Sequence, residues 1–349
     1  MPKTKVGVIF GGRSGEHEVS LMSAASVIEF LPPEKYEPVL IGITREGGWI
    51  TEGNPWEILR QGESDKQGGP IPVDLLASLD VVFPVLHGTF GEDGTIQGLF
   101  EMCDVPYVGA GVLGSSVGMD KAIMRSVFRD QGLPLADYKV IMRHEWTQKS
   151  NEVCRDIVDA FGFPVFVKPA NMGSSVGLSK ARDKNELKQS LDLASRYDRK
   201  IIIEEFVPGR EIECSVLGND APQASVVGEI VPHHEYYDYE AKYTDGRADL
   251  IIPAPLEDEV VTEVQSLAVA AFKAVDCCGM ARVDFFLHEI TGEVIVNEIN
   301  TIPGFTNLSM YPRLWQASGI SYPELLDRLI GLALERYAER KKFCTRYNK

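Results

Sequence analysis

The chain reads Arg282-Val283-Asp284-Phe285-Phe286-Leu287 and, after a break of six residues, Val294-Ile295-Val296-Asn297-Glu298-Ile299-Asn300. Both stretches are rich in β-branched and aromatic residues, and the break between them predicts a hairpin turn. If the hairpin is symmetric about Thr291, Asp284 lies opposite Glu298 and Arg282 lies opposite Asn300. Because side chains alternate along a strand, these four side chains then share one face of the sheet.

This pairing places two carboxylates opposite each other. Opposed carboxylates repel, so stability alone does not favour the pairing. A divalent cation removes the conflict, and Asp, Glu and Asn oxygens suit Mg²⁺, which takes one or two carboxylates beside phosphate and water oxygens. The hairpin therefore predicts a Mg²⁺–phosphate site with an arginine beside it. The alternative is a solvated polar face at a sheet edge, because the register is inferred from the pattern.

The composition is that of a globular chain. The 349 residues are 44% hydrophobic and predict two or three domains. The net charge of −16 argues against nucleic-acid and membrane-surface partners. No apolar run approaches the roughly 20 residues of a membrane span, and the N-terminal residues do not resemble a secretory signal. Six scattered cysteines without a C-x-x-C pair predict no zinc site and favour a reducing compartment, the cytoplasm.

Strand and helix patterns alternate in the first third of the chain. Short apolar runs over residues 6–10, 39–43 and 79–85 predict strands, and residues 20–31 have helical character. This alternation predicts a parallel α/β sheet. The segment from Glu52 to Pro72, which is rich in Gly, Gln and charged residues, predicts an insertion or a long surface loop.

A second unit is expected to begin near Lys121. Its expected elements are a helix through residue 128, helices over 151–161 and 185–197, and strands over 164–168 and 201–206. Pro208-Gly209 then interrupts the chain and starts a third unit, which contains the hairpin.

A glycine-rich loop follows directly on the strand that ends at Lys168. In Gly173-Ser174-Ser175-Val176-Gly177, glycines let backbone N–H groups approach an anion, and the hydroxyls of Ser174 and Ser175 add donors. Lys168 can place a positive charge on the same phosphates. The loop is not a Walker loop, since its lysine precedes the glycines. Taken alone, it fits an ordinary Gly-Ser turn equally well.

An acidic hinge strengthens the phosphate interpretation. The stretch Glu204-Glu205-Phe206-Val207-Pro208-Gly209-Arg210-Glu211 ends an apolar strand and turns sharply. It offers backbone groups to an adenine edge, and carboxylates to the adenine amino group and the ribose hydroxyls. Acidic residues at strand ends are common. The order of lysines, glycine loop, acidic hinge, Arg-x-Asp and Glu-x-Asn is far more specific than any one of its members.

In this order of motifs the chain resembles the ATP-grasp enzymes, and specifically the D-alanine–D-alanine ligase family. The stretches that carry the resemblance span nearly the whole chain and are Gly11-Gly12-Arg13-Ser14-Gly15-Glu16-His17-Glu18-Val19-Ser20, His87-Gly88, Gly91-Glu92-Asp93-Gly94, Met119-Asp120-Lys121, Gly173-Ser174-Ser175-Val176-Gly177, Asp238-Tyr239-Glu240-Ala241-Lys242-Tyr243 and Asn300-Thr301-Ile302-Pro303-Gly304-Phe305-Thr306. The resemblance implies an α/β fold with an N-terminal, Rossmann-like, substrate-binding domain over residues 1–121. A two-lobed ATP-grasp fold is implied after it, with a central lobe over 122–208 and a C-terminal lobe, carrying the metal site and a lid loop, over 209–349.

The resemblance also implies a reaction and its cofactors. ATP would phosphorylate the first D-alanine, and the amine of the second would attack the acyl phosphate, giving D-alanyl-D-alanine for peptidoglycan precursor synthesis. The implied cofactors are ATP and two Mg²⁺ ions, with Mn²⁺ as a substitute, and the implied assembly is a homodimer. The residues implied to hold the ions are Asp284, Glu298 and Asn300. Those implied to contact the nucleotide are Lys121, Lys168 and Ser175 at the phosphates and Glu204, Glu205, Val207 and Glu211 at adenine and ribose.

Arg282 has a second implied use. Across from Asn300 it can reach the developing oxyanion of the tetrahedral intermediate, with the backbone N–H of Gly304 as the other donor. The alternative is a purely structural ion pair between Arg282 and Asp284. Ser309 and the loop that begins at Gly304 would take the carboxylate of the second substrate, although an ordinary turn fits these residues equally well.

Glu16 follows the Gly-Gly turn after the first strand, at the edge where α/β sheets bind ligands. By the resemblance it pairs with the ammonium group of the first D-alanine, and Ser174 helps to hold it in place. From the residues alone, a carboxylate favoured by a helix start is the better interpretation. His87 is expected as a neighbour of the substrate pocket, although a lone histidine is more often structural.

Residues 232–246 are aromatic and charged without helical or strand period, and they predict a mobile loop. A lid that excludes water would protect an acyl phosphate from hydrolysis. The resemblance brings Lys242 and Tyr243 of this lid into the site. Relatives that make D-alanyl-D-lactate depart from this Lys-Tyr pattern, so the pattern favours an amine nucleophile. D-serine stays open as the second substrate.

Three other classes of protein fit the sequence less well. A different ATP-grasp carboxylate–amine ligase would keep the hairpin and the glycine loop, but not residues 16–20 or Lys242-Tyr243. A non-catalytic nucleotide-binding regulator would tolerate the loss of Arg282 or of a metal carboxylate, yet all are present. A dinucleotide oxidoreductase is disfavoured because residues 11–15 lack the G-x-G-x-x-G spacing.

Overall fold

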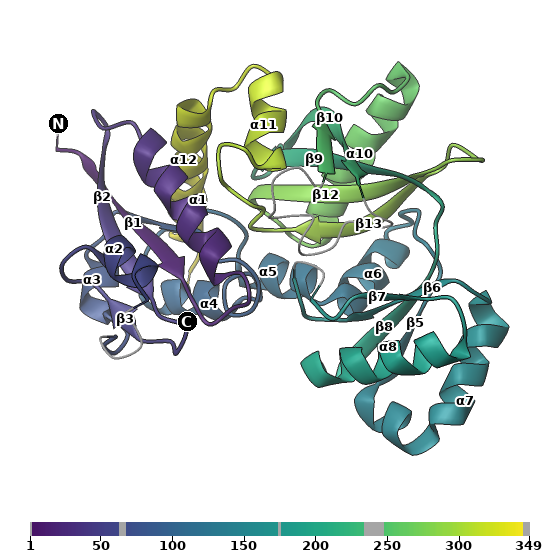
Figure 1. Cartoon of the computed structure of the whole chain (residues 1–349). Helices are drawn as coiled ribbons and strands as arrows, with labels where there is room; N and C mark the ends of the chain where they lie inside the picture. Colours follow the sequence, from purple (N-terminus) through teal and green to yellow (C-terminus); the bar gives the residue numbers. More distant parts are fainter. Residues whose placement is uncertain (1, 63–67, 174–175, 234–247, 345–349) are drawn as a thin grey trace.

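Three sheets organise the protein (Figure 1). The structure is a computed structural model that describes residues 2–62, 68–173, 176–233 and 248–344. The strand order is β3-β2-β1-β4 in the N-terminal sheet, β5-β8-β6-β7 in the central sheet and β11-β10-β9-β12-β13 in the C-terminal sheet. The predicted α/β class, with an N-terminal sheet unit followed by two further lobes, is confirmed.

The N-terminal sheet is parallel except at one edge. β1 (Thr4–Gly11) pairs in parallel with both β2 (Tyr36–Ile43) and β4 (Val81–Pro84), whereas β3 (Trp49–Ile50) pairs antiparallel with β2. The three predicted strands are therefore confirmed. The helices of this part of the chain are α1 (His17–Phe30), α2 (Pro55–Arg60), α3 (Val73–Ala77), α4 (Thr95–Met102) and α5 (Val112–Met119). Of these, α1 begins three residues before the predicted start.

The prediction of an insertion or long loop over residues 52–72 was wrong for residues 55–60, which form α2. The side chain of Asn54 accepts a hydrogen bond from the N–H of Glu57 at 3.4 Å, and Pro55 occupies the first helical position. An asparagine cap followed by proline is a helix-start signal, which the glycine and charge content of the segment concealed. A bridge between Trp49 and Gly69 ties the far end of the segment to β3.

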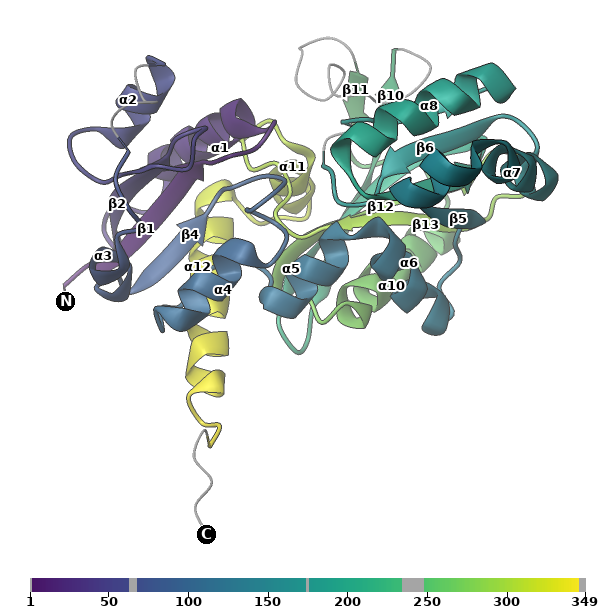
Figure 2. The same cartoon turned by 90° about the horizontal axis from the view of Figure 1, so that it is seen from below.

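The last helix of the described chain packs against the first sheet. α12 (Tyr322–Arg340) lies along the N-terminal sheet, beside α1 in Figure 1 and past β4 in Figure 2. One buried apolar cluster joins Val8 of β1, Val27 of α1 and Leu329 of α12. The core of the first sheet is therefore built from both ends of the sequence. Across the described ranges, no helix has both the length and the apolar character that crossing a membrane requires.

The central sheet separates an apolar face from a polar one. Its elements are β5 (Tyr138–Met142), β6 (Val165–Pro169), β7 (Ser179–Ala181), β8 (Lys200–Glu205), α7 (Arg143–Phe161) and α8 (Lys184–Tyr197), with α6 (Lys121–Asp130) leading into it. Val165 and Val167 of β6 and Ile203 of β8 pack in the core formed with α7 and α8. Because side chains alternate along a strand, Lys168 and Glu204 face the other way.

The C-terminal sheet has the same design. Its elements are β9 (Gly209–Gly218), β10 (Gln223–Pro232), β11 (Ala248–Ile251), β12 (Gly279–His288), β13 (Val294–Asn300), α10 (Asp258–Ala274) and α11 (Met310–Ala317). Val283 and Phe285 of β12 pack in the core that α10 completes with Phe272. Alternation turns Arg282 and Asp284 to the opposite face of the sheet.

Candidate active site

The two predicted residue pairs of the hairpin are confirmed, but the strands contain a β-bulge that was not predicted. Asp284 lies opposite Glu298 and Arg282 lies opposite Asn300. A turn symmetric about Thr291 would also pair Phe285 with Asn297, whereas Phe285 lies opposite Val296 and the register shifts between residues 284 and 285. A bulge adds one residue to one strand, here Asn297. As a result, Asn297 and Glu298 both line the same cavity.

A row of three carboxylates crosses the C-terminal sheet. Glu213 of β9 and Glu298 of β13 are the two register partners of Asp284. Arg282 offsets their repulsion, because its Nε and Nη2 donate to Asp284 at 2.7 and 2.8 Å and its Nε lies 3.0 Å from Glu213. Asn300 Nδ2 also donates to Asp284 at 2.9 Å. The ion pair that the sequence left as the alternative for Arg282 is thus present.

The oxygen donors of the hairpin fit a hard divalent cation that shares its ligands with phosphate. Among the described residues, no three His, Cys, Asp or Glu side chains converge to form a complete metal cage. Mg²⁺ rarely needs one, because it takes one or two carboxylates from the protein and fills its other positions with phosphate and water oxygens. Asp284 and Glu298 lie opposite each other across the hairpin, and Asn300 follows Glu298 by two residues on the same strand, so the three supply that kind of donor set.

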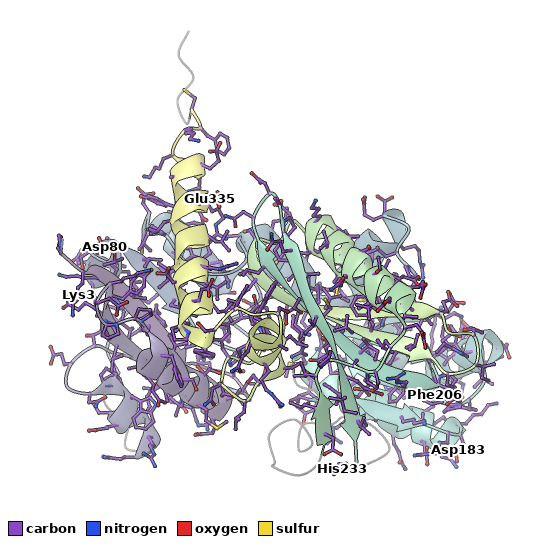
Figure 3. The ribbon with its side chains drawn as sticks, turned by 90° about the horizontal axis from the view of Figure 1, so that it is seen from above. Lys3, Asp80, Asp183, Phe206, His233 and Glu335 are labelled. Carbon is purple, nitrogen blue, oxygen red and sulfur yellow. The ribbon has the colours of Figure 1, made fainter. Side chains whose placement is uncertain are left out.

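A cavity of about 360 Å³ is lined by the polar faces of the central and C-terminal sheets. Its volume suits a small-molecule ligand. Eight residues that the sequence assigned to nucleotide or metal line it, namely Lys121, Lys168, Glu204, Glu205, Val207, Glu211, Asp284 and Glu298. Phe206 also lines it and lies on the side of the molecule away from Glu335 of α12 (Figure 3). Arg282 and Asn300 adjoin the cavity through Asp284.

Lys168 and Glu204 form a buried ion pair on the central wall of the cavity. Lys168 Nζ lies 2.7 Å from Glu204 Oε2 and 3.4 Å from Asn297 Oδ1. Burial lowers the pKa of Lys168 from its ordinary value, although Glu204 opposes that shift. Burial by itself would raise the pKa of Glu204. The neighbouring cations Arg125 and Lys168 outweigh this effect and hold the pKa of Glu204 below its ordinary value. Glu204 is therefore a buried carboxylate kept ionised by two cations.

Lys121 reaches the cavity from the start of α6. Asp120 caps this helix, because its side chain accepts hydrogen bonds from the backbone N–H groups of Ala122 and Ile123, and this fixes the backbone position of Lys121. Lys121 Nζ lies 3.4 Å from Glu298 Oε2 and donates to the carbonyl of Met172 at 3.0 Å. One lysine thus connects the hairpin to the glycine-rich loop.

Glu16 is enclosed by two glycines. It stands immediately before α1 and is buried, and its N–H donates to Ser14 Oγ at 3.1 Å. A Cβ atom at Gly88 would come within 2.5 Å of Glu16 Oε2, and one at Gly173 within 2.6 Å. Gly88 also has a φ of +73°, so a larger residue would meet both strain and collision. Gly173, at the start of the glycine-rich loop, therefore lies against Glu16, which stands at the helix start expected from the residues alone.

Two titratable groups, the buried His87 and the partly buried Glu92, connect Glu16 to the loop after β13. His87 Nδ1 lies 3.0 Å from the carbonyl of Ile302, and burial lowers the pKa of His87 although Glu16 opposes the shift. Glu92 accepts hydrogen bonds from the N–H groups of Gly88 at 2.9 Å and Ile302 at 3.2 Å. Burial, aided by Glu16, raises the pKa of Glu92 to about 8 against the effect of these donors.

Gly304 and Ser309 lie close together, at the start of α11. A Cβ atom at Gly304 would lie 3.1 Å from Ser309 Oγ. Ser309 Oγ accepts from the N–H of Thr306 at 3.1 Å and lies 2.8 Å from its hydroxyl. The N–H of Phe305 donates to Ser23 Oγ at 3.3 Å, which holds this loop against α1. Gly304, Ser309 and Glu16 do not line the 360 Å³ cavity.

Four predicted site residues, Ser174, Ser175, Lys242 and Tyr243, lie outside the described residues, as does most of the predicted lid. Sequence reasoning assigned no role to Glu213, Glu92, Asn297 or Arg125. Glu213 carries a signal, because it is a charge inside an apolar strand, and Arg125 follows Lys121 by one helical turn. For Asn297 no pattern in the sequence reveals the bulge.

The lysines, the acidic hinge and the β12–β13 hairpin thus meet at one cavity. Comparison with known protein families identifies the family to which the chain belongs. A family model described as D-ala D-ala ligase N-terminus matches residues 5–110, and one described as D-ala D-ala ligase C-terminus matches residues 127–331. The chain belongs to the D-alanine–D-alanine ligase family. Membership implies ATP as a substrate, as the resemblance predicted.

Curated relatives and solved structures of D-alanine–D-alanine ligases match the chain over nearly its whole length. The D-alanine–D-alanine ligase of Natranaerobius thermophilus is 48% identical, with 100% of each chain covered, and that of Halothermothrix orenii is 51% identical, with 96% and 99% covered. The solved D-alanine–D-alanine ligase of Coxiella burnetii is 38% identical, with a TM-score of 0.85 and 98% and 97% covered. The VanG D-Ala:D-Ser ligase of Enterococcus faecalis is 36% identical, with a TM-score of 0.84 and 95% and 100% covered.

Proposed function

We infer that the protein joins two D-alanines to D-alanyl-D-alanine, a peptidoglycan precursor, with release of ADP and phosphate. The observation that carries this inference is the convergence of residues from α6, β6, β8 and the β12–β13 hairpin on one cavity. These residues are far apart in the sequence, and together they supply two lysines, an acidic hinge and two opposed carboxylates. Phosphoryl transfer needs this kind of positioning and charge neutralisation.

The nucleotide would occupy the cavity between the two sheets. Lys121 and Lys168 contact its phosphates, together with Ser175 and Lys242, while Glu205, Val207 and Glu211 with Glu204 hold adenine and ribose. Asp284, Glu298 and Asn300 would hold two Mg²⁺ ions, or Mn²⁺ in their place. When bound, these ions neutralise the charge that develops on the transferring phosphoryl group. In the structure Glu298 faces Lys121 instead, which supports an exchange of one cation for another at this carboxylate.

The first D-alanine would bind where the glycine-rich loop meets Glu16. A buried carboxylate suits an ammonium group, and Gly88 and Gly173 leave no side chain in the way. Ser174 and Tyr243 complete this part of the site. ATP then transfers its γ-phosphoryl group to the carboxylate of this amino acid, giving an acyl phosphate and ADP.

The amine of the second D-alanine attacks the acyl phosphate, and phosphate leaves. Arg282 and the N–H of Gly304 stabilise the oxyanion that forms, and Ser309 binds the carboxylate of the second amino acid. The close approach of Gly304 to Ser309 supports this division of roles within one loop.

The assembly and location of the protein complete the proposal. Homodimer formation is supported by the exposed apolar side chains of Met102 on α4 and Leu113 on α5, two helices in contact with each other. A reducing compartment, the cytoplasm, is supported by the six free cysteines.

Phosphate release tests the proposal. The full-length protein is assayed with ATP and Mg²⁺, and with D-alanine alone, L-alanine, D-alanine plus D-serine, or D-alanine plus D-lactate. Products are identified by mass spectrometry. We expect phosphate release and a D-alanyl-D-alanine mass with D-alanine alone, and no turnover of L-alanine. Preferred formation of D-alanyl-D-serine would assign the protein to the chemistry of its VanG relative. The absence of turnover with every D-amino acid would refute ligase activity.

A further inference from the structure

Arg125 is fully buried, with 1% of its surface exposed. It lies on α6, four residues after Lys121, and residues at this spacing share one face of a helix. That face meets the bulged end of β13, because Lys121 lies 3.4 Å from Glu298 and Arg125 Nη2 lies 3.3 Å from the side-chain oxygen of Asn297. Arg125 does not itself line the nucleotide cavity.

Glu204 carries two cations, one on each oxygen. Arg125 Nη2 lies 2.9 Å from Oε1, and Lys168 Nζ lies 2.7 Å from Oε2. All three side chains are largely buried, but Lys168 and Glu204 line the cavity while Arg125 stands behind them. Of the two cations on Glu204, Lys168 can therefore meet a ligand directly, whereas Arg125 can act only through Glu204 and Asn297.

The geometry of Arg125 is poor for a residue kept only to stabilise the fold. Within the described ranges its Nε–H has no hydrogen-bond acceptor, and Glu204 Oε1 receives no well-aligned hydrogen bond despite the short distance. Buried ion pairs are weak evidence for stability, because desolvation offsets their attraction. Two imperfect contacts on a buried guanidinium suggest a role in the charge balance of the neighbouring site.

We propose that Arg125 is a positioning residue for the nucleotide, remaining as the counter-ion of Glu204 when Lys168 turns to the phosphates. This rests on the proposed function, which assigns the phosphates to Lys168. If Lys168 were the sole counter-ion of Glu204, moving it would leave a buried carboxylate unpaired. With Arg125 in place, the carboxylate keeps one cation throughout, so Lys168 is available to the ligand.

The test compares nucleotide affinity among variants of the full-length protein. Binding of ADP in the presence of Mg²⁺ is measured by titration calorimetry for the wild type, Arg125→Met, Glu204→Gln and the double variant. We expect Arg125→Met to weaken ADP binding on the order of tenfold, because Glu204 would then hold Lys168 as its only counter-ion and keep it from the phosphates. In the Glu204→Gln background the same change should alter the Kd by less than about twofold, since no carboxylate then holds Lys168.

Two controls separate this role from a general loss of structure. Arg129→Met changes the same residue type on the same helix, where Arg129 stacks on Tyr138 at 4.4 Å, and should leave ADP affinity unchanged. KM for D-alanine should stay within about twofold in Arg125→Met, whereas a merely structural residue would affect both substrates. Arg125→Lys, which keeps the charge but loses the planar fork, should fall between the wild type and Arg125→Met.

Wild-type ADP affinity in whichever Arg125 variant folds would overturn the proposal. So would a tenfold loss that persists undiminished in the Glu204→Gln background, because Arg125 would then act by another route. If the wild type itself bound no ADP, the proposed function would fail instead, so the two failures are distinguishable.

Discussion

Two clusters of acidic side chains, one at the β12–β13 hairpin and one near Glu16, differ in their surroundings. The hairpin cluster, Glu213 with Asp284 and Glu298, lies beside the cations Arg282 and Lys121. The loop cluster, Glu16 with Glu92, is surrounded by backbone N–H donors, glycines and a buried histidine. Both clusters bring carboxylates together, and like charges at short range repel unless a cation or a proton offsets them.

The difference indicates what each cluster is prepared to receive. Arginine and lysine compensate the hairpin cluster, so an arriving metal ion would exchange one cation for another. At the loop cluster, the raised pKa of Glu92 means that a proton compensates part of the charge. An arriving ammonium group would therefore replace a proton there. The two clusters thus match the two kinds of cation in the proposed reaction, metal ions and an amino acid.

The largest effect is expected from removing the resident cation of the hairpin cluster. Arg282→Ala should lower kcat about 10²- to 10³-fold, as the loss of an oxyanion donor does. Initial rates at saturating ATP, Mg²⁺ and D-alanine measure it, and the thermal midpoint reports on folding. If the folded variant kept a kcat within about threefold of the wild-type value, Arg282 would have only a structural role, as the ion-pair partner of Asp284.

At the loop cluster, Glu92→Gln should change how stability depends on pH. The pKa of Glu92 is about 8 in the folded protein against an ordinary 4.5, so the folded protein holds a proton that the unfolded chain releases. The wild type then loses stability as pH rises from about 4.5 through about 8. Between pH 6 and 8, the free energy of unfolding of Glu92→Gln should rise relative to wild type by roughly 2 kcal/mol. Urea denaturation at both pH values measures this, and a difference independent of pH would contradict it.

The smallest effect sharpens the assignment within the hairpin cluster. Asp284→Asn removes a proposed metal ligand and should raise the Mg²⁺ concentration for half-maximal rate about tenfold. Glu213→Gln removes a carboxylate from the same row that is not a proposed ligand, and should leave that concentration unchanged. Magnesium titrations of the initial rate compare the two variants. If both variants raised the half-maximal Mg²⁺ concentration equally, the three carboxylates would act on Mg²⁺ through their total charge, and Asp284 would not be a specific ligand.

Local patterns predicted the elements of the fold better than their junctions. Apolar runs and alternation were sufficient for β1, β2, β12 and β13, because burial on one face determines which residues are apolar. The alternation of side chains also predicted that Asp284 lies opposite Glu298. It cannot reveal an inserted residue, so the bulge at Asn297 was missed. Helix α2 was missed because the composition of its surroundings outweighed a two-residue start signal.

The parts of the candidate site that lie within one continuous stretch of sequence could be predicted. Lys168, the acidic hinge and the hairpin each belong to a continuous stretch, and they meet at the cavity as expected. Arg125 and Glu92 are different, because their significance lies in side chains contributed by other elements. Arg125 meets Glu204 from β8 and Asn297 from β13, and Glu92 meets the N–H of Ile302. Such relations depend on tertiary packing, which no local pattern contains.

The packing of α12 on the first sheet has a consequence for biosynthesis. Residues 4–84 form all four strands of that sheet, yet part of the apolar cluster on it comes from residues 322–340. A ribosome delivers the strands first and the covering helix last, at roughly 5–20 residues per second. For some tens of seconds the nascent sheet therefore lacks α12, whose apolar side chains complete the buried cluster that includes Val8 and Phe83. In the cell this interval is when the protein is most exposed to aggregation.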